Sequence, residues 1–256
     1  MSDGDQLLHR LGLRLQSFGR ALEQPGRLRR KFTGVRLDED LMGLALRPYM
    51  RADGVRTVLD VGANEGQFAS TAVFAFPAAK IVCFEPLPSA QPALRAVADR
   101  HQGRLEIEPF ALGDTSGHVD LNVTNFSPSS SILPVEQHTA VPIDVAETTR
   151  VAIRCLSEWA ATKSLVPDII MKLDVQGYEA NVLRGGIDVL KQTRVVIAET
   201  TFTPLYQGQS SLGDLCAILE PLGFSYREAF GVVRDADSGA PLWQDSVFVA
   251  GGRPEH

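Results

Sequence analysis

Six charged side chains stand at or beside the ends of apolar segments, where the chain is expected to leave a sheet. They are Asp60, Glu85, Lys172, Asp174, Glu179 and Glu199. Carboxylates accept hydrogen bonds from hydroxyl groups and can take up a proton, and a lysine ammonium can balance their charge. Because an unpaired charge is costly to bury, these residues indicate a site rather than core.

The run Asp60-Val-Gly-Ala-Asn-Glu-Gly66 lies between a predicted strand and a predicted helix. Gly62 has no Cβ, so the chain can turn sharply there and a ligand can approach the backbone. The helix that follows offers free N–H groups to a carboxylate, such as the one on the amino-acid end of S-adenosylmethionine (SAM). We therefore predict a SAM site that includes Asp60, Gly62, Ala63, Asn64 and Gly66.

Glu85 ends the second predicted strand, 23 residues after Gly62. A carboxylate at this place can accept hydrogen bonds from both ribose hydroxyls of a nucleoside. The alternative is a nicotinamide-dependent oxidoreductase, whose fingerprint is G-x-G-x-x-G. That pattern fails twice, because Asn64 and Gln67 stand where it needs glycine. The residues therefore favour SAM over a dinucleotide.

Methyl transfer from a sulfonium is an in-line displacement, in which an enzyme mainly supplies proximity and orientation. An alcohol acceptor also needs a base, and the candidates are Asp174, Glu179, Glu199 and His138. We prefer Asp174, because it ends the fourth parallel strand next to the point where ligands bind in open α/β sheets. Glu199 is the reserve candidate. A structural alternative pairs Lys172 with Glu199 and leaves Asp174 as a helix cap.

Residues 125–149 form a predicted loop that is rich in serine and proline, and loops this long often cover an active site. Ser129, Ser130 and Ser131 either bind a polyol or the cofactor carboxylate, or form a turn. Carboxylates could also hold magnesium, which would lower the pKa of the acceptor hydroxyl. The sequence shows no dedicated ligand cluster, so we predict no metal.

Alternating strands and helices predict an α/β fold with a parallel sheet and right-handed crossovers. The expected parallel strands are 56–61, 80–84, 105–111, 168–174 and 195–199, and 224–230 and 243–250 are expected to close the sheet as an antiparallel pair. Two further strands are expected at 118–124 and 151–155. The expected helices are 38–50, 65–76, 89–101, 156–163, 179–190 with a break at Gly185-Gly186, and 211–222.

The net charge of −6 is distributed unevenly along the 256 residues, since residues 1–36 hold eight Lys/Arg against three Asp/Glu. We expect residues 1–36 to form a basic amphipathic helical segment and residues 37–256 a single domain. Residues 7–31 could contact an anionic membrane surface, the body of the protein or a second subunit. The acidic body argues against nucleic acid as a partner, because the two would repel each other.

The three cysteines are far apart, and no apolar run reaches the length of a membrane-spanning helix of about 18 residues. The N-terminus also lacks the apolar region of a signal peptide. These features predict reduced thiols and a cytoplasmic location, with membrane association left open.

Several segments together resemble the FkbM-type methyltransferases, over about residues 56 to 250. They are 58–66, 83–86, 111–114, 129–131, 172–179, 182–186 and 198–199. The most specific is Lys172-Leu-Asp-Val-Gln-Gly-Tyr-Glu179, in which Gln176 stands where many relatives carry Glu.

The resemblance implies a Rossmann-like, seven-stranded class I methyltransferase sheet, mostly parallel with an antiparallel C-terminal strand and preceded by N-terminal helices. It implies that Pro86, Ala111 and Leu112 also bind SAM, and that Lys172, Asp174, Glu179 and Glu199 lie at the catalytic centre. It further implies methyl transfer to a hydroxyl of a sugar, in a glycolipid or oligosaccharide, or of a related natural product. A SAM-binding module without catalytic activity is the remaining alternative.

Overall fold

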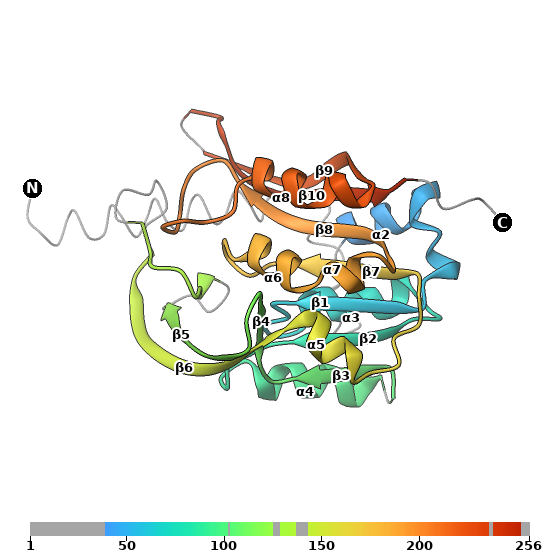
Figure 1. The fold of residues 1–256 in the computed structure, drawn as a ribbon, viewed down its shortest axis with the longest axis horizontal. Coiled ribbons are helices and arrows are strands. Elements are labelled where there is room, and N and C mark those ends of the chain that lie inside the picture. Colours follow the sequence, from blue (N-terminus) through green and yellow to red (C-terminus); the bar gives the residue numbers. More distant parts are fainter. Residues whose placement is uncertain (1–38, 102, 125–128, 137–142, 236–237, 252–256) are drawn as a thin grey trace, which may run out of the picture.

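A computed structural model describes residues 39–251, apart from 102, 125–128, 137–142 and 236–237. A seven-stranded sheet with the order β3-β2-β1-β7-β8-β10-β9 forms its centre (Figure 1). The strands are β1 Thr57–Val61, β2 Lys80–Phe84, β3 Leu105–Glu108, β7 Ile169–Leu173, β8 Thr193–Thr201, β9 Phe224–Arg234 and β10 Pro241–Ala250. The first five strands in this order run parallel, and β10 is antiparallel to both of its neighbours. The predicted fold class is confirmed.

Helices cover both faces of the sheet and enclose two apolar cores. On one face lie α2 Glu39–Ala45, α3 Gln67–Ala75 and α4 Gln91–Arg100. On the other lie α5 Leu156–Ala161, α6 Glu179–Gly185, α7 Ile187–Leu190 and α8 Leu212–Leu219. The β1 strand is buried along its whole length, as expected for a central parallel strand with both faces covered.

A second, three-stranded sheet lies beside the first and has the order β4-β6-β5. Its strands are β4 Ala111–Gly113, β5 Gly117–Thr124 and β6 Val145–Cys155. The expected third strand, 105–111, is therefore wrong at its end: Pro109, which has no N–H to donate, follows β3, and Ala111 joins the small sheet. The expected loop 125–149 is also too long, because β6 begins at Val145. The first residues of β6 are mostly exposed, so this part of the sequence lacks the alternation of apolar and polar residues that predicts a strand.

The first expected helix, 38–50, is interrupted. The α2 helix ends at Ala45, and a separate 3-10 turn occupies Pro48–Met50. Proline keeps the residue before it extended, and Arg47 has a ψ of 137°. Two further 3-10 turns occupy Ala52–Gly54 and Glu220–Leu222.

The break expected at Gly185-Gly186 separates α6 from α7, and it has a packing reason. A Cβ on Gly185 would lie 1.9 Å from the carbonyl oxygen of Gly113, so glycine lets α6 approach the backbone of β4. This contact ties the small sheet to the helical layer.

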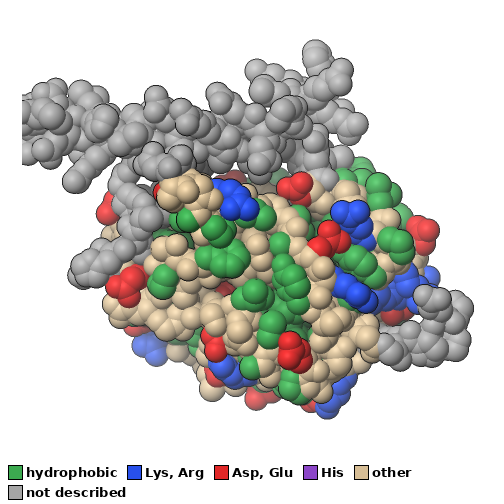
Figure 2. Space-filling model, turned by 90° about the horizontal axis from the view of Figure 1, so that it is seen from above, with side chains coloured by type: hydrophobic (Ala, Val, Ile, Leu, Met, Phe, Trp, Pro, Cys, Tyr) green, Lys and Arg blue, Asp and Glu red, His purple; other side chains and the backbone are tan. Residues whose placement is uncertain are grey.

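Figure 2 shows the face above α8, β9 and β10, where hydrophobic side chains gather in the middle and charged side chains lie among and around them. Among the helices that the structure describes, none is long and apolar enough to span a membrane. The predicted N-terminal helix and the predicted contact through residues 7–31 lie outside the described residues.

Candidate active site

A pocket of about 260 Å³ opens at the carboxyl ends of β1, β2 and β7. The predicted site residues that line it are Asp60, Gly62, Ala63, Asn64, Glu85, Pro86, Ala111, Leu112, Lys172 and Asp174. Gly66, Glu179 and Glu199 are not among its lining residues. The pocket thus brings the predicted cofactor motif and part of the predicted catalytic group together.

The turn after β1 lies directly against the end of β7. The N–H groups of Gly62 and Ala63 both donate to the carbonyl oxygen of Phe84, at 3.0 and 3.1 Å. Gly62 has a φ of 83°, and a Cβ there would lie 1.9 Å from the carbonyl oxygen of Asp174. Glycine is therefore required at position 62 for two reasons, its left-handed backbone and the passage of Asp174.

Gly66 serves helix packing rather than the pocket. It precedes α3 with a φ of 86°, and a Cβ there would lie 2.9 Å from Cδ1 of Leu94 in α4. Glycine at position 66 therefore lets α3 start close to α4. A role for Gly66 in holding SAM would be indirect, through the orientation of α3.

Glu85 connects the loops that follow β1 and β2. Its Oε2 accepts from the N–H of Asn64 at 2.7 Å, and its Oε1 accepts from the N–H of Leu87 at 2.8 Å. Burial raises the pKa of this carboxyl, and the two N–H donors oppose that shift. Each carboxylate oxygen has a second lone pair, so Glu85 can hold these loops and still accept from a ribose hydroxyl.

Asp60 is a buried carboxylate in the pocket wall, only 1% exposed, and its Oδ2 has no hydrogen-bond partner among the described residues. Burial raises its pKa to about 7, Lys172 opposes that shift, and Asp174 and Glu85 add to it. A buried acid without a partner for one oxygen is stabilised by a cation. SAM carries a sulfonium and an ammonium, so the pocket fits this cofactor.

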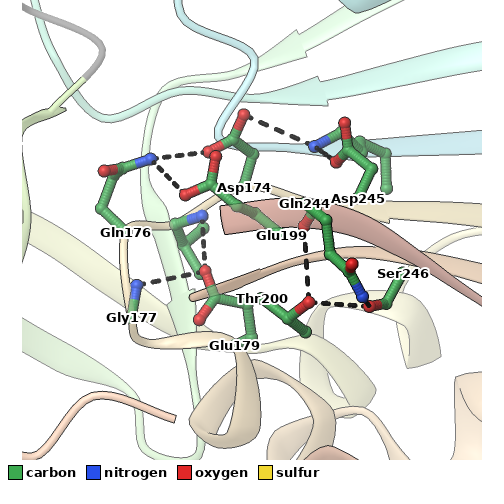
Figure 3. A network of polar contacts seen from close by, with 11 residues as sticks. Asp174, Gln176, Gly177, Glu179, Glu199, Thr200, Gln244, Asp245 and Ser246 are labelled. Atoms are coloured by element: carbon green, nitrogen blue, oxygen red, sulfur yellow. Dashed lines mark hydrogen bonds and ion pairs between the residues drawn. The ribbon is translucent and has the colours of Figure 1, made fainter. Parts of the chain in front are cut away.

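Three charged residues form the Lys172 cluster, which consists of Lys172, Asp174 and Asp245. Figure 3 labels its two carboxylates. The Nζ of Lys172 lies 3.0 Å from Oδ1 of Asp245 and 3.4 Å from Oδ2 of Asp174. Burial alone would lower the pKa of Lys172, but Asp174, Asp245 and Glu199 outweigh it and raise the pKa. Lys172 is therefore a fixed positive charge and not a general base.

Gln176 joins Asp174 to Glu199. Its Nε2 donates to Oδ1 of Asp174 at 2.8 Å and to Oε1 of Glu199 at 3.1 Å (Figure 3). Burial raises the pKa of Glu199 well above its usual range; Asp174 adds to the shift and Lys172 opposes it. The structural alternative of a Lys172–Glu199 ion pair is wrong, because Lys172 forms its ion pairs with Asp174 and Asp245.

Glu179 supports the loop after β7. Its Oε1 accepts from the N–H groups of Val175 and Gly177, at 3.1 and 3.2 Å, and the residue is 2% exposed. Burial raises its pKa to about 7, against these N–H donors. Its position suits a residue that holds the loop around Gln176, outside the pocket wall.

The serine run has a structural role in part. The hydroxyl of Ser131 donates to the carbonyl oxygen of Gln176 at 2.7 Å, and the carbonyl oxygen of Ser129 accepts from Tyr206 at 2.7 Å. Ser130 lines the pocket, and its hydroxyl accepts from the N–H of Thr124. The other loop candidate, His138, lies outside the described residues.

Sequence reasoning missed Asp245, Tyr206 and Phe68. A signal for Asp245 was available in the sequence. Asp245 lies on the same face of its strand as Trp243 and Val247, so it places a charge on a face that is otherwise apolar. Phe68 lines the pocket from the first turn of α3, and Tyr206 follows β8 in a segment without periodicity. Within the described part of the chain, no three His, Cys, Asp or Glu residues are grouped so as to hold a metal ion.

Comparison with known proteins gives a family and two relatives. The family model described as "Methyltransferase FkbM domain" matches residues 60–226. The 2-O-methyltransferase NoeI of Sinorhizobium fredii (strain NBRC 101917 / NGR234) is 28% identical over 231 residues, which cover 83% of this chain and 86% of NoeI. The 31-O-demethyl-FK506 methyltransferase FkbM of Streptomyces tacrolimicus is 27% identical over 207 residues, which cover 72% of this chain and 75% of that protein.

Among solved structures, the chain is similar to the magnesium protoporphyrin IX methyltransferase (ChlM) from Synechocystis PCC 6803 with bound SAM. The TM-score is 0.44 at 11% identity, and the match covers 93% of this chain and 91% of that one. A likeness at this level supports no conclusion about the site.

Proposed function

The chain belongs to the FkbM methyltransferase family, whose cofactor is SAM, and from this premise we propose that it methylates a hydroxyl oxygen of a sugar or a related natural product. Family membership removes the support for the nicotinamide-dependent alternative. The names of the two relatives, a 2-O-methyltransferase and a 31-O-demethyl-FK506 methyltransferase, support oxygen as the acceptor atom.

One observation carries the proposal: Asp174 belongs to both parts of the pocket. Its carbonyl oxygen lies 1.9 Å from the position that a Cβ of Gly62 would take, and its carboxylate lies in the Lys172 cluster. A ligand on the Gly62 turn therefore lies beside this carboxylate. The Asp174 side chain is 37% exposed, so an acceptor hydroxyl can approach it.

Bound SAM would supply an electrophilic methyl carbon and would leave as S-adenosylhomocysteine. Asp174 accepts the proton of the acceptor hydroxyl while the oxygen bonds to that carbon. Lys172 holds one carboxylate oxygen and Gln176 holds the other, so the Asp174 carboxylate is oriented before the acceptor arrives. Phe68 lines the same pocket as Asp174 and adds an apolar side chain to its wall.

The acceptor is proposed to carry no net charge. The described pocket wall contains Asp60, Glu85, Asp174 and Asp245 against the single ammonium of Lys172. These carboxylates suit the positive charges of SAM and would repel an anionic acceptor. A neutral polyol, such as a sugar ring, can instead donate hydroxyl protons to them.

Isotope transfer tests this function. The full chain is incubated with SAM that carries a ¹³C methyl group and with neutral glycans, glycolipids or polyketides that have a free hydroxyl. We expect S-adenosylhomocysteine to form together with a labelled methoxy group, and neither should form without acceptor. Tight SAM binding without transfer to any neutral hydroxyl compound, but with transfer to a nitrogen or carbon acceptor, would contradict the proposal.

Membrane contact through residues 7–31 remains a proposal from the sequence, as does the division at residue 36. Anionic liposomes should sediment the full chain and leave a chain that starts at Val35 in solution, because the basic residues are removed. Equal, negligible sedimentation of both chains would contradict membrane contact without affecting the proposed reaction.

A further inference from the structure

The side chain of Gln176 makes three hydrogen bonds, two with the carboxylates of Asp174 and Glu199 and one with the hydroxyl of Tyr206. Its amide nitrogen donates to Asp174 and to Glu199, at 2.8 and 3.1 Å. Its amide oxygen accepts from the hydroxyl of Tyr206 at 3.0 Å. Among side chains of this length, only an amide can donate to two carboxylates at one atom and accept from a phenol at the other.

The backbone of Gln176 is held in an uncommon conformation. Its φ is 54°, and the following Gly177 has a φ of 97°. A left-handed conformation at a residue other than glycine costs free energy and persists only where its surroundings impose it. The buried Glu179 carboxylate accepts from the N–H of Gly177 (Figure 3) and from the N–H of Val175, on the two sides of Gln176. The hydroxyl of Ser131 donates to the carbonyl oxygen of Gln176.

Residues 129–136, here named the strap, cross from the small sheet to the loop after β8. Ser131 pairs with Asn122 of β5, and Val135 pairs with Tyr206. Two of its residues, Ser130 and Ile132, line the pocket. The strap is therefore attached at both ends and forms part of the pocket wall.

Tyr206 connects the strap to Gln176. Its hydroxyl shares one proton between two acceptors, the carbonyl oxygen of Ser129 at 2.7 Å and the amide oxygen of Gln176 at 3.0 Å, and the residue is 2% exposed. Burial raises the pKa of this phenol, with nearby Glu199 and Asp174 adding to the shift, so the hydroxyl keeps its proton and remains a donor.

We propose that Gln176 is a positioning residue that couples the strap to the carboxylate of Asp174. With the strap in place, Tyr206 fixes the amide, and the amide fixes the Asp174 carboxylate toward the pocket. A displaced strap leaves the amide free to rotate, and Asp174 then loses its Oδ1 partner. The kinetic consequence rests on the proposed function, because it requires Asp174 to act on the acceptor.

Three variants separate the two directions of the coupling. Gln176→Glu keeps an oxygen that can accept from Tyr206 but has no donor for Asp174 and Glu199. Tyr206→Phe removes the link to the strap and leaves the donors of Gln176 in place. Gln176→Leu has a similar size and removes both.

Hydrogen exchange of the strap amides tests the coupling without any acceptor. We expect Tyr206→Phe and Gln176→Leu each to speed exchange at Ser131 and Leu133 by about tenfold, the scale of losing a buried hydrogen bond, and Gln176→Glu to change it by less than about twofold. The double variant Gln176→Leu/Tyr206→Phe should exchange no faster than Tyr206→Phe alone, because Tyr206→Phe already removes the hydrogen bond between Tyr206 and Gln176. Additive effects in the double variant would overturn the coupling.

Steady-state kinetics with the acceptor found by isotope transfer test whether Gln176 positions the carboxylate of Asp174. Gln176→Glu should lower kcat by about 10–100-fold, the scale of losing a hydrogen bond to a charged group, while KM for the acceptor and the Kd for SAM stay within about threefold. A merely structural role would instead change stability and both constants together. Unchanged kcat in Gln176→Glu would overturn the positioning role. If wild type transfers no methyl group, the proposed function fails, and the exchange experiment still decides the coupling.

Discussion

The proposed SAM end of the pocket, here called the SAM end, is assembled from residues 60–68 and 84–87, whereas the Lys172 cluster and its neighbours come from β7, β8, β10 and the strap. At the SAM end, backbone geometry dominates: glycine at position 62, two N–H donors to Phe84 and two to Glu85. At the other end, side chains far apart in sequence hold one another through charge.

This difference decides what each end tolerates. A substitution that conflicts with the backbone conformation strains the chain, so a change at the SAM end should first affect folding and cofactor binding. A substitution among the charged side chains leaves its partners without a fixed orientation, so a change near Lys172 should first affect turnover. Variants can therefore test whether the two ends are separable, and Gly62 and Asp174 are the residues where they touch.

The largest effect is expected from Asp174→Asn. Loss of a general base typically costs about 10²–10⁴-fold in rate, while the Kd for SAM should stay near that of wild type because the backbone contact with Gly62 remains. Turnover at saturating SAM should be compared with that of Glu199→Gln, which lies outside the pocket wall. Near-normal turnover of Asp174→Asn with a selective loss in Glu199→Gln would transfer the role to Glu199.

Gly62→Ala should break the contact between the two ends. A Cβ would lie 1.9 Å from the carbonyl oxygen of Asp174, and the φ of 83° disfavours alanine. We expect the free energy of unfolding in urea to fall by about 2–4 kcal/mol. Gly103→Ala is the matched control, because its φ is 75° and no atom lies within 4 Å of the added Cβ. If the free energy of unfolding falls no further in Gly62→Ala than in the control, the structure relieves the clash with Asp174 without losing stability.

Glu85→Gln should weaken SAM binding by about 10–100-fold, since it removes the charge and one acceptor from a buried carboxylate. The structure also leads us to expect a loss of stability, because Glu85 accepts from two backbone N–H groups that the sequence did not reveal. Glu65→Gln makes the same chemical change on an exposed side chain of the neighbouring loop. Calorimetry that gives equal SAM affinity for both variants would remove Glu85 from the ribose site.

The smallest effect concerns pH and Asp60. Burial raises its pKa to about 7, so below that pH the binding of cationic SAM must first remove a proton. Affinity for SAM should therefore rise by about tenfold between pH 5.5 and 7 and then level off. Asp60→Asn cannot titrate, so its affinity should be lower and nearly independent of pH in this range. The same slope in both proteins would assign the pH dependence to another group.

The sequence predicted the geometry of the turn after β1 and the place of Glu85 well, because these features are local. A glycine turn, a helix start and an acid at the next strand end all lie within 30 residues, and each has a recognisable pattern. The parallel strands followed from their apolar runs, and the errors fell where Pro109 ends β3 and where polar residues begin β6.

The Lys172 cluster could be predicted only in part. The run Lys172-Leu-Asp174 identified two of its members, but the third, Asp245, comes from β10 and pairs opposite Glu199. Which carboxylate lies against Lys172 depends on sheet order and register, and these are set by pairing over long distances. For the same reason Tyr206 and its contact with the strap had no signal in the sequence.

Asp174 is proposed to face the methyl group that the SAM end delivers, and a crystal structure of the full chain with SAM bound tests this most directly. We expect the amino-acid end of SAM on the turn at residues 62–64, the ribose hydroxyls at Glu85 and the methyl carbon directed toward the carboxylate of Asp174. Density with the methyl carbon directed away from Asp174 and the Lys172 cluster would contradict it.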